Sequence, residues 1–318
     1  MSRFFIALLL GLLGMACLAT YADAQVLVSD FNLDRIVRYD ADGSTPTVLV
    51  ASSAGGLDLP HRTRIGPDGL LYVASAGTDQ ILRYHATTGA FIDVFVGSTT
   101  GLDYPVDFLF RPDGYLYVSS QANSAILRYN STTGALDAGW SAQHASLSGP
   151  SGIVFDNTGH LYVAGRFSNN LVRFDATTGA HQLTFGNVSL AHGLALLPDG
   201  RLLVASGQGN TVEAFTAPDS AAPAQSTLVT GLTLPVGLEV DPLTGSLLVA
   251  NYGSGSISRH ALTDGALLGT FGTGDLLNGP NYFTVLTTAV AVPEPSATAA
   301  LFGGCVLLAE ASRRRRTY

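Results

Sequence analysis

An internal repeat of about 45 residues constrains this 318-residue chain more than any other feature of its sequence. The middle residue of one short apolar segment recurs six times, at spacings of 45, 45, 45, 41 and 45 residues. These six residues are Leu27, Tyr72, Tyr117, Tyr162, Leu203 and Leu248. Because a unit of this length cannot bury its apolar faces by itself, neighbouring copies have to stack on one another. The repeat therefore predicts one domain, over residues 25–290.

One copy, residues 70–114, shows what each unit contains. Its segments LYVAS, ILRY, FIDVFV and FLF are short and rich in β-branched and aromatic residues, and turn formers separate them. Thr-Thr-Gly at 87–89 recurs at 132–134 and 177–179, and supplies a glycine for a tight turn. Four short strands with short connections form an antiparallel blade. Six copies thus predict an all-β, six-bladed β-propeller of four-stranded antiparallel blades.

The two ends of the repeat region predict how the ring closes. The chain enters at Gln25 with a strand that lacks the partner preceding it in the other copies. It leaves at 282–286 with a strand that lacks the partner following it in the other copies. Pairing of the first and last strands would complete one blade and remove two free sheet edges.

The repeated pattern is clearest at residues 150–164, which read PSGIVFDNTGHLYVA. This pattern resembles NHL repeats and the gluconolactonase-type propellers. The resemblance covers residues 25–290 and implies the six-bladed fold. It does not select an activity, because one fold hosts many functions.

The charge balance excludes some partners. The sequence has no lysine, and residues 25–290 hold 11 arginines and 21 acidic residues, a formal charge of −10. Attraction to nucleic acid or to anionic lipid is therefore not expected. The two cysteines, Cys17 and Cys305, both lie in terminal segments that we expect to be removed. The mature protein would then contain no cysteine, and its stability would come from packing and strand pairing.

The N-terminal 24 residues predict export. Arg3 is followed by an apolar run over 4–18, and Ala22-Asp23-Ala24 precedes Gln25. This order is typical of a secretory signal peptide, 1–24, cleaved between Ala24 and Gln25. Two alternatives fit less well. A membrane anchor needs an apolar run of about 20 residues, which is longer than this run. A lipoprotein signal at Cys17 needs a large apolar residue three places earlier, where this sequence has Gly14.

The C-terminal segment, 291–318, closely resembles the PEP-CTERM sorting signal of bacteria that use an exosortase. It has a Pro-Glu-Pro motif, a short apolar stretch over 297–309 and an arginine cluster. The motif residues are Pro293, Glu294 and Pro295, and the arginines are Arg313, Arg314, Arg315 and Arg316. The resemblance implies processing by an exosortase-type enzyme and a transient anchor in the inner membrane, with the arginines in the cytoplasm. An ordinary tail anchor, the alternative, would not require Pro-Glu-Pro.

Candidate chemistry lies where each copy enters its innermost strand, at the mouth of the central channel. The residue after the entering proline or its equivalent is His61, Val106, Ser151, His192, Val236 or Asn281. The next residue is Arg62, Asp107, Gly152, Gly193, Gly237 or Tyr282. Histidine is a common metal ligand and a proton carrier near neutral pH. His61 and His192 stand three blades apart, so we expect them to face each other across the channel.

The propeller resemblance implies a role for three of these residues. His61 and His192 resemble the histidine that serves as metal ligand or base in related lyases. Asn281, in Pro280-Asn281, resembles the asparagine that helps gluconolactonase-like propellers bind a divalent cation. The implied cofactor is calcium or zinc in the central channel. The sequence departs from those propellers because no glutamate occupies any of these six repeated positions. The alternative is that the polar residues only line a water-filled channel.

The first copy departs from the others by reading Pro60-His61-Arg62-Thr63-Arg64. Two guanidinium groups beside a histidine would suit a carboxylate or an acidic sugar. The alternative, which we favour, is an ion pair between Arg62 and Asp107 of the adjacent blade.

Taken together, these features predict an exported propeller at the cell surface or in the extracellular matrix of a Gram-negative-type bacterium. Its expected role is non-catalytic binding or scaffolding, with an extracellular polysaccharide or a surface protein as partner. One alternative is a metal-dependent lactonase or lyase that uses His61, His192, Asn281 and Asp107. Another is a purely structural matrix protein with neither pocket chemistry nor a specific ligand. No Gly-x-Ser-x-Gly, phosphate-binding loop or Cys-x-x-Cys motif occurs in the sequence.

Overall fold

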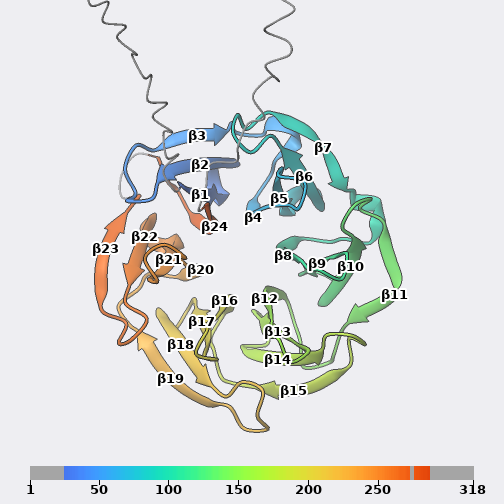
Figure 1. Cartoon of the computed structure of the whole chain (residues 1–318), viewed down its shortest axis with the longest axis vertical. Helices are drawn as coiled ribbons and strands as arrows, with labels where there is room; N and C mark the ends of the chain where they lie inside the picture. The colour runs from blue at the N-terminus through green and yellow to red at the C-terminus, as the bar shows by residue number, and fades with distance from the viewer. Residues whose placement is uncertain (1–24, 273–275, 287–318) are drawn as a thin grey trace, which may run out of the picture.

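The computed structural model, which describes residues 25–272 and 276–286, is a ring of six four-stranded antiparallel sheets around a central axis (Figure 1). This confirms the predicted six-bladed propeller. The segments predicted to be the signal peptide and the sorting signal lie outside the described residues. No helix among the described residues is long and apolar enough to cross a membrane.

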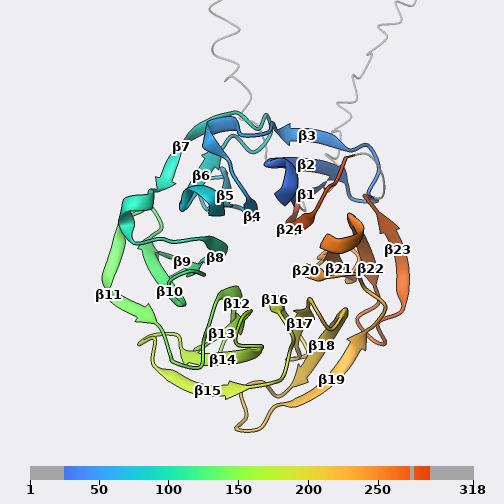
Figure 2. The same ribbon diagram turned by 180° about the vertical axis from the view of Figure 1, so that it is seen from behind.

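Each blade runs from an inner strand at the axis to an outer strand at the rim, as both views show (Figures 1 and 2). The first blade contains β24 (Pro280–Leu286), β1 (Gln25–Asp30), β2 (Arg35–Asp40) and β3 (Thr47–Val50). The second contains β4 (Pro60–Ile65), β5 (Leu71–Ser75), β6 (Gln80–Tyr84) and β7 (Phe91–Val96). The third contains β8 (Pro105–Phe110), β9 (Tyr115–Ser120), β10 (Ala125–Asn130) and β11 (Leu136–Ala142).

The other three blades repeat this order. The fourth contains β12 (Pro150–Phe155), β13 (His160–Gly165), β14 (Asn170–Asp175) and β15 (His181–Phe185). The fifth contains β16 (Ala191–Leu196), β17 (Leu202–Ser206), β18 (Thr211–Thr216) and β19 (Ala224–Val229). The sixth contains β20 (Pro235–Val240), β21 (Leu247–Asn251), β22 (Ser256–His260) and β23 (Leu267–Phe271). Short 3-10 helices in the described residues are η1 (Phe31–Leu33), η2 (Ala54–Gly56), η3 (Ala76–Thr78), η4 (Ser98–Thr100) and η5 (Tyr252–Ser254).

The first and last strands close the ring as predicted. β1 pairs antiparallel with β24, and the register aligns Gln25 with Leu286 and Val28 with Phe283. The first blade is therefore built from both ends of the propeller. This closure gives the first blade the same four strands as each of the other five.

The repeated LYVAS segment is apolar because both of its faces are covered. All five residues of β5 are buried, since each blade lies between two neighbours. Tyr72 shows why an aromatic ring suits this position. Its ring meets Phe95 of its own blade at 5.1 Å and Phe110 of the next blade at 4.9 Å, both edge-on. The Tyr72 hydroxyl donates a hydrogen bond to Asp68 at 2.9 Å.

The repeated Thr-Thr-Gly turn joins neighbouring blades. In the third blade this turn ends at Gly134, whose φ is +70°. A Cβ added there would lie 2.0 Å from the carbonyl oxygen of Phe95 in the outer strand of the second blade. Gly89 stands in the same relation to Leu49 of the first blade. The glycine therefore serves close packing between blades as well as the turn itself.

Candidate functional site

A group of large side chains blocks the centre of the channel. Arg62 Nε donates to Asp107 Oδ1 at 2.7 Å and Arg62 Nη2 to Asp107 Oδ2 at 3.2 Å, which is the expected ion pair between adjacent blades. Arg62 Nη1 donates to Glu239 Oε2 at 3.0 Å. The guanidinium carbon lies 4.5 Å from the centre of the Tyr282 ring. We call these four residues the plug.

Tyr282 extends the plug to the opposite side of the channel. It belongs to β24 in the first blade, and its hydroxyl lies 3.1 Å from the hydroxyl of Ser151 on β12 in the fourth blade. Burial raises the pKa of Tyr282, so the phenol stays protonated. The channel is thereby divided into two separate cavities.

The other half of the plug layer is made of glycines. A Cβ added at any of the three would meet the carbonyl oxygen of the next inner strand at 2.4 to 2.6 Å. The contacts are Gly152 to His192, Gly193 to Val236 and Gly237 to Asn281. Four successive inner strands therefore pack backbone to backbone, while Arg62, Asp107 and Tyr282 fill the space beside them.

The upper cavity lies on the side of the plug where the inner strands begin, and its volume is about 170 Å³. Its lining residues are Phe31, His61, Tyr104, Arg166, Leu190, His192, Leu234, Val236, Tyr252 and Asn281. The structure thus brings together His61, His192 and Asn281 among the predicted site residues. It places Arg62 and Asp107 in the plug, away from this lining.

The rim of the upper cavity is held in an unusual backbone conformation. Tyr104, Leu190 and Leu234, each directly before the start of an inner strand, have φ values of +54°, +49° and +48°. This region is uncommon for large side chains. The preceding blade supports each residue by accepting its backbone N–H at 2.8 or 2.9 Å. The acceptors are the side-chain oxygens of Asp79, Asn169 and Asn210, respectively.

A hydrogen bond defines the state of His61. The amide Nδ2 of Asn281 lies 2.8 Å from His61 Nδ1 and can only donate. His61 Nδ1 is therefore the acceptor, so the neutral ring carries its proton on Nε2. Phe31 and Tyr104 hold the ring edge-on, with centroids 5.1 and 5.6 Å away. The orientation of the Nε2–H donor is thus fixed.

Each member of the hydrogen-bonded pair His61 and Asn281 has one polar atom without a partner among the described residues. These atoms are His61 Nε2 and Asn281 Oδ1. The side chains are buried, with exposed fractions of 5% and 3%. An unpaired buried polar atom costs about 1–3 kcal/mol. The pair His61 and Asn281 therefore offers one free donor and one free acceptor.

Both histidines are neutral at physiological pH. Burial, with a smaller contribution from the Arg166 charge, lowers the pKa of His61 to about 3. Burial also lowers the pKa of His192 well below its usual value, and Arg166 and His61 add to this effect. Neither imidazole contributes positive charge to the cavity.

These lowered pKa values predict a loss of stability in mild acid. The unfolded chain binds a proton at each histidine below about pH 6.5, whereas folded His61 does so only near pH 3. The free energy of unfolding should therefore fall as the pH drops from 6.5 towards 3. The slope is about 1.4 kcal/mol per pH unit for each histidine. Urea titrations from pH 7 to 4 should show a shallower fall in a His61→Gln, His192→Gln variant.

The control for this slope is His85→Gln, because His85 is exposed on the outer part of the second blade. It should retain the slope of the unmodified protein. An unchanged slope in the double variant would show that the two channel histidines are not the cause.

Arg166 supplies the positive charge of the upper cavity. No aspartate or glutamate is among the lining residues. The Arg166 Nε atom is buried without a partner in the part of the chain that the structure describes. The cavity therefore carries one positive charge and favours an anion.

The same features test whether the predicted calcium or zinc fits. Within residues 25–272 and 276–286, no group of three or more His, Cys, Asp or Glu side chains is placed to hold a metal ion. The lining offers two neutral imidazoles, one of them protonated on its free nitrogen, and one amide oxygen. A guanidinium faces them. These residues do not fit a divalent cation, which needs anionic or lone-pair donors.

The predicted site residues did not include Phe31, Arg166 or Tyr252, although these three residues occupy equivalent positions of the repeat. They occupy one column, immediately after the second strand of each blade. The column is Phe31, Ala76, Gln121, Arg166, Gly207 and Tyr252. Its spacings match those of the strand itself, so the same alignment of copies would have found it.

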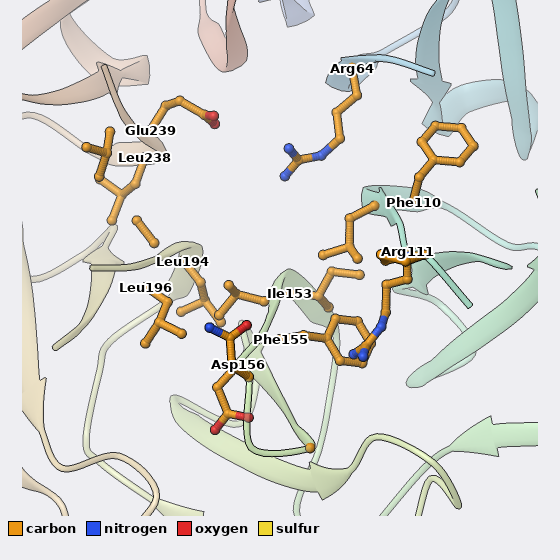
Figure 3. Close-up of a pocket in the computed structure, with 17 residues that line it drawn as sticks. Arg64, Phe110, Arg111, Ile153, Phe155, Asp156, Leu194, Leu196, Leu238 and Glu239 are labelled. Carbon is orange, nitrogen blue, oxygen red and sulfur yellow. The ribbon is translucent and has the colours of Figure 1, made fainter. Parts of the chain in front are cut away.

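The lower cavity lies on the other side of the plug and has a volume of about 670 Å³. Figure 3 shows the Arg64 guanidinium pointing into it. Its apolar wall includes Ile153, Leu194 and Leu238, which follow the three plug-layer glycines. The Arg111 guanidinium stacks on Phe155 at 4.0 Å. The sequence had not indicated this cavity.

Comparison with known proteins gives a repeat family and a fold. A family model described as "Repeat of unknown function (DUF6923)" matches residues 26–200. No curated protein matches the chain. The chain is similar to one in the crystal structure of a nidogen/laminin complex, with 15% identity and a TM-score of 0.68. That match covers 83% of this chain and 98% of the other.

Other similar solved structures include enzymes. Hydrazine synthase from Kuenenia stuttgartiensis matches with 18% identity and a TM-score of 0.59, over 83% of this chain and 92% of the other. A catalytically inactive His-to-Ala variant of virginiamycin B lyase from Staphylococcus aureus, with quinupristin, matches with 15% identity and a TM-score of 0.60. That match covers 83% of this chain and 89% of the other. At these identities the likeness shows the fold alone.

Proposed function

Because this chain belongs to the family "Repeat of unknown function (DUF6923)", whose description assigns no activity, we propose a function from the geometry of the upper cavity. The protein is an exported module of the cell surface or extracellular matrix. It binds a partner at the upper cavity without converting it. The partner is an extracellular polysaccharide or a surface protein.

The observation that carries this proposal is the pair of unpartnered buried atoms, His61 Nε2 and Asn281 Oδ1. A bound group that accepts from the first and donates to the second would remove the energetic cost of leaving them unpaired. The strained rim of Tyr104, Leu190 and Leu234 keeps the cavity preformed. Preformed cavities with a few fixed polar groups are typical of ligand sites.

The proposed location rests on the two ends of the sequence. A signal peptide over 1–24 would export the chain, and the Pro-Glu-Pro segment over 291–318 would direct it to an exosortase-type enzyme. The C-terminal segment would anchor it transiently in the membrane. The similarity to a chain in a nidogen/laminin complex supports the use of this fold in a module that binds a protein partner.

The alternative, a metal-dependent lactonase or lyase, is less well supported. Such an enzyme would place a cation beside His61, His192 and Asn281, where Arg166 would repel it. A histidine whose pKa is lowered to about 3 is also a weak base at neutral pH. Asp107 is bound by Arg62 inside the plug rather than available in the cavity.

A comparison of two cavity-filling variants tests the proposed function. Val236→Phe adds a ring to the upper cavity, whereas Val240→Phe adds one to the lower cavity. Labelled full-length protein is titrated against purified extracellular polysaccharide and against cell-surface protein fractions. We expect Val236→Phe to weaken binding at least tenfold and Val240→Phe to leave it unchanged, with thermal melting confirming that both fold.

Two results would contradict the proposal. One is a loss of binding in Val240→Phe but not in Val236→Phe. The other is the absence of any binding by the unmodified protein to both fractions.

A further inference from the structure

We infer that the ligand of the upper cavity is a carboxylate with a hydrogen-bond donor beside it, presented by an acidic sugar of an extracellular polysaccharide. This inference rests on the proposed function and specifies its ligand.

The donors suit a carboxylate. The Nε2–H of His61 is buried, unpartnered and fixed in direction by the Asn281 amide. Arg166 lines the same cavity, and its Nε–H also has no partner among the described residues. A carboxylate has two oxygens that can accept from both side chains, and hydrogen bonds from a guanidinium to a carboxylate are strong.

The acceptor requires a donor next to that carboxylate. Asn281 uses its Nδ2 on His61 and leaves Oδ1 buried without a partner in the described chain. A bare carboxylate would leave this oxygen unpaired. A hydroxyl beside the carboxylate, as in a sugar acid, would donate to it.

The charge of the cavity selects an anion over a wide pH range. The titratable groups that line it are His61, His192, Arg166, Tyr104 and Tyr252. Burial lowers the pKa of both histidines, which therefore stay neutral, and raises that of Tyr104. Asp107 lies below the lining and is held by Arg62. The attraction to a carboxylate comes from Arg166 and does not depend on protonating a histidine.

The aromatic residues of the lining and the cavity volume favour a sugar. Phe31 and Tyr104 pack on His61, and Tyr252 packs on Phe31. All three line the cavity, and aromatic faces pack against the apolar faces of sugar rings. The cavity has a volume of about 170 Å³. This space suits one terminal sugar rather than a length of chain. The formal charge of −10 over residues 25–290 opposes a dense polyanion, which also favours an isolated acidic sugar.

Isothermal titration of the full-length protein with three sugars tests the ligand. The probes are glucuronate, glucose and the methyl ester of glucuronate. We expect glucuronate to bind at least tenfold more tightly than the two neutral sugars, with an affinity that is unchanged between pH 5.5 and 8. Arg166→Gln should remove this preference, whereas Arg111→Gln, in the lower cavity, should retain it.

The outcomes separate this inference from the function on which it rests. Equal binding of glucose and glucuronate, with no effect of Arg166→Gln, would overturn the acidic-sugar ligand. The proposed function would still stand if Val236→Phe abolished binding to the polysaccharide or protein fractions. N-acetylglycine, titrated in the same way, represents a protein C-terminus. Tighter binding of N-acetylglycine than of glucuronate would overturn the acidic sugar and identify a protein C-terminus as the ligand. Binding that strengthens as the pH falls towards 5.5 would assign the charge to a histidine and contradict the role of Arg166.

Discussion

Asp107→Asn is expected to lower the free energy of unfolding by about 3–5 kcal/mol, because it leaves the Arg62 guanidinium buried with a weakened partner. Asp107 receives two hydrogen bonds from Arg62, and it also accepts the backbone N–H groups of Phe108 and Ile153 at 2.8 and 3.1 Å. Neither side chain of the pair is exposed beyond 1%. Urea denaturation at pH 7, followed by circular dichroism, measures the change.

The matched control is Asp93→Asn, on an outer strand. Asp93 binds Arg83 at 2.6 Å, but 45% of its side chain is exposed. Exposed ion pairs contribute less than about 1 kcal/mol, so the control should be close to the unmodified protein. Replacing Arg62 and Asp107 together by apolar residues, Arg62→Met with Asp107→Leu, should recover part of the lost stability. Equal effects of Asp107→Asn and Asp93→Asn would show that the plug does not stabilise the ring.

Gly134→Ala is expected to destabilise the ring by about 3–5 kcal/mol, because two penalties add at this turn. The φ of +70° disfavours any residue with a Cβ. The added methyl would also lie 2.0 Å from the Phe95 carbonyl oxygen, so the second and third blades would have to separate. The shift in urea midpoint at constant slope measures this loss.

Gly114→Ala, in the same blade, separates the two penalties. Gly114 has a φ of +86°, but a Cβ there would meet nothing within 4 Å. It should lose only the conformational part, about 1 kcal/mol. If both substitutions had the same effect, the turn would matter for its backbone angle and not for the contact between blades.

The fold followed from the sequence because its signal is repeated six times. A spacing near 45 residues and the unmatched strands at 25 and 282–286 were sufficient to predict the blades and their closure. The repeat also placed His61, His192 and Asn281 at the mouth of the channel. It did so because one position in a repeated strand has the same height and direction in every blade.

The side chains that line the site were harder to predict, because the direction in which each one points depends on its contacts with neighbouring blades. Arg62 is adjacent to His61 in the sequence, yet it turns into the plug while His61 lines the cavity. Whether Arg62 would bind Asp107 or a ligand depended on a distance between strands 45 residues apart. Arg166 was missed because it lies on a different column, just after a strand rather than at the start of one.

The lower cavity was not predicted because it forms where glycines leave side chains absent. Gly152, Gly193 and Gly237 let their strands approach closely and add no side chains of their own to the plug layer. The residues that follow them then form the cavity wall (Figure 3). A glycine in a strand pattern indicates a close approach of backbones, but it does not show on which side space remains.

The pairing of Gln25 with Leu286 also places both ends of the propeller on the same side of the ring. Along β24, Asn281 lies at the upper cavity, and Leu286 lies five residues further along the strand, beyond the plug. Both the beginning and the end of the propeller therefore leave from its lower side. A protein tethered through its C-terminal segment would turn the lower cavity towards the tether. It would hold the His61 and Asn281 side outwards, where material arriving from the surroundings meets it first.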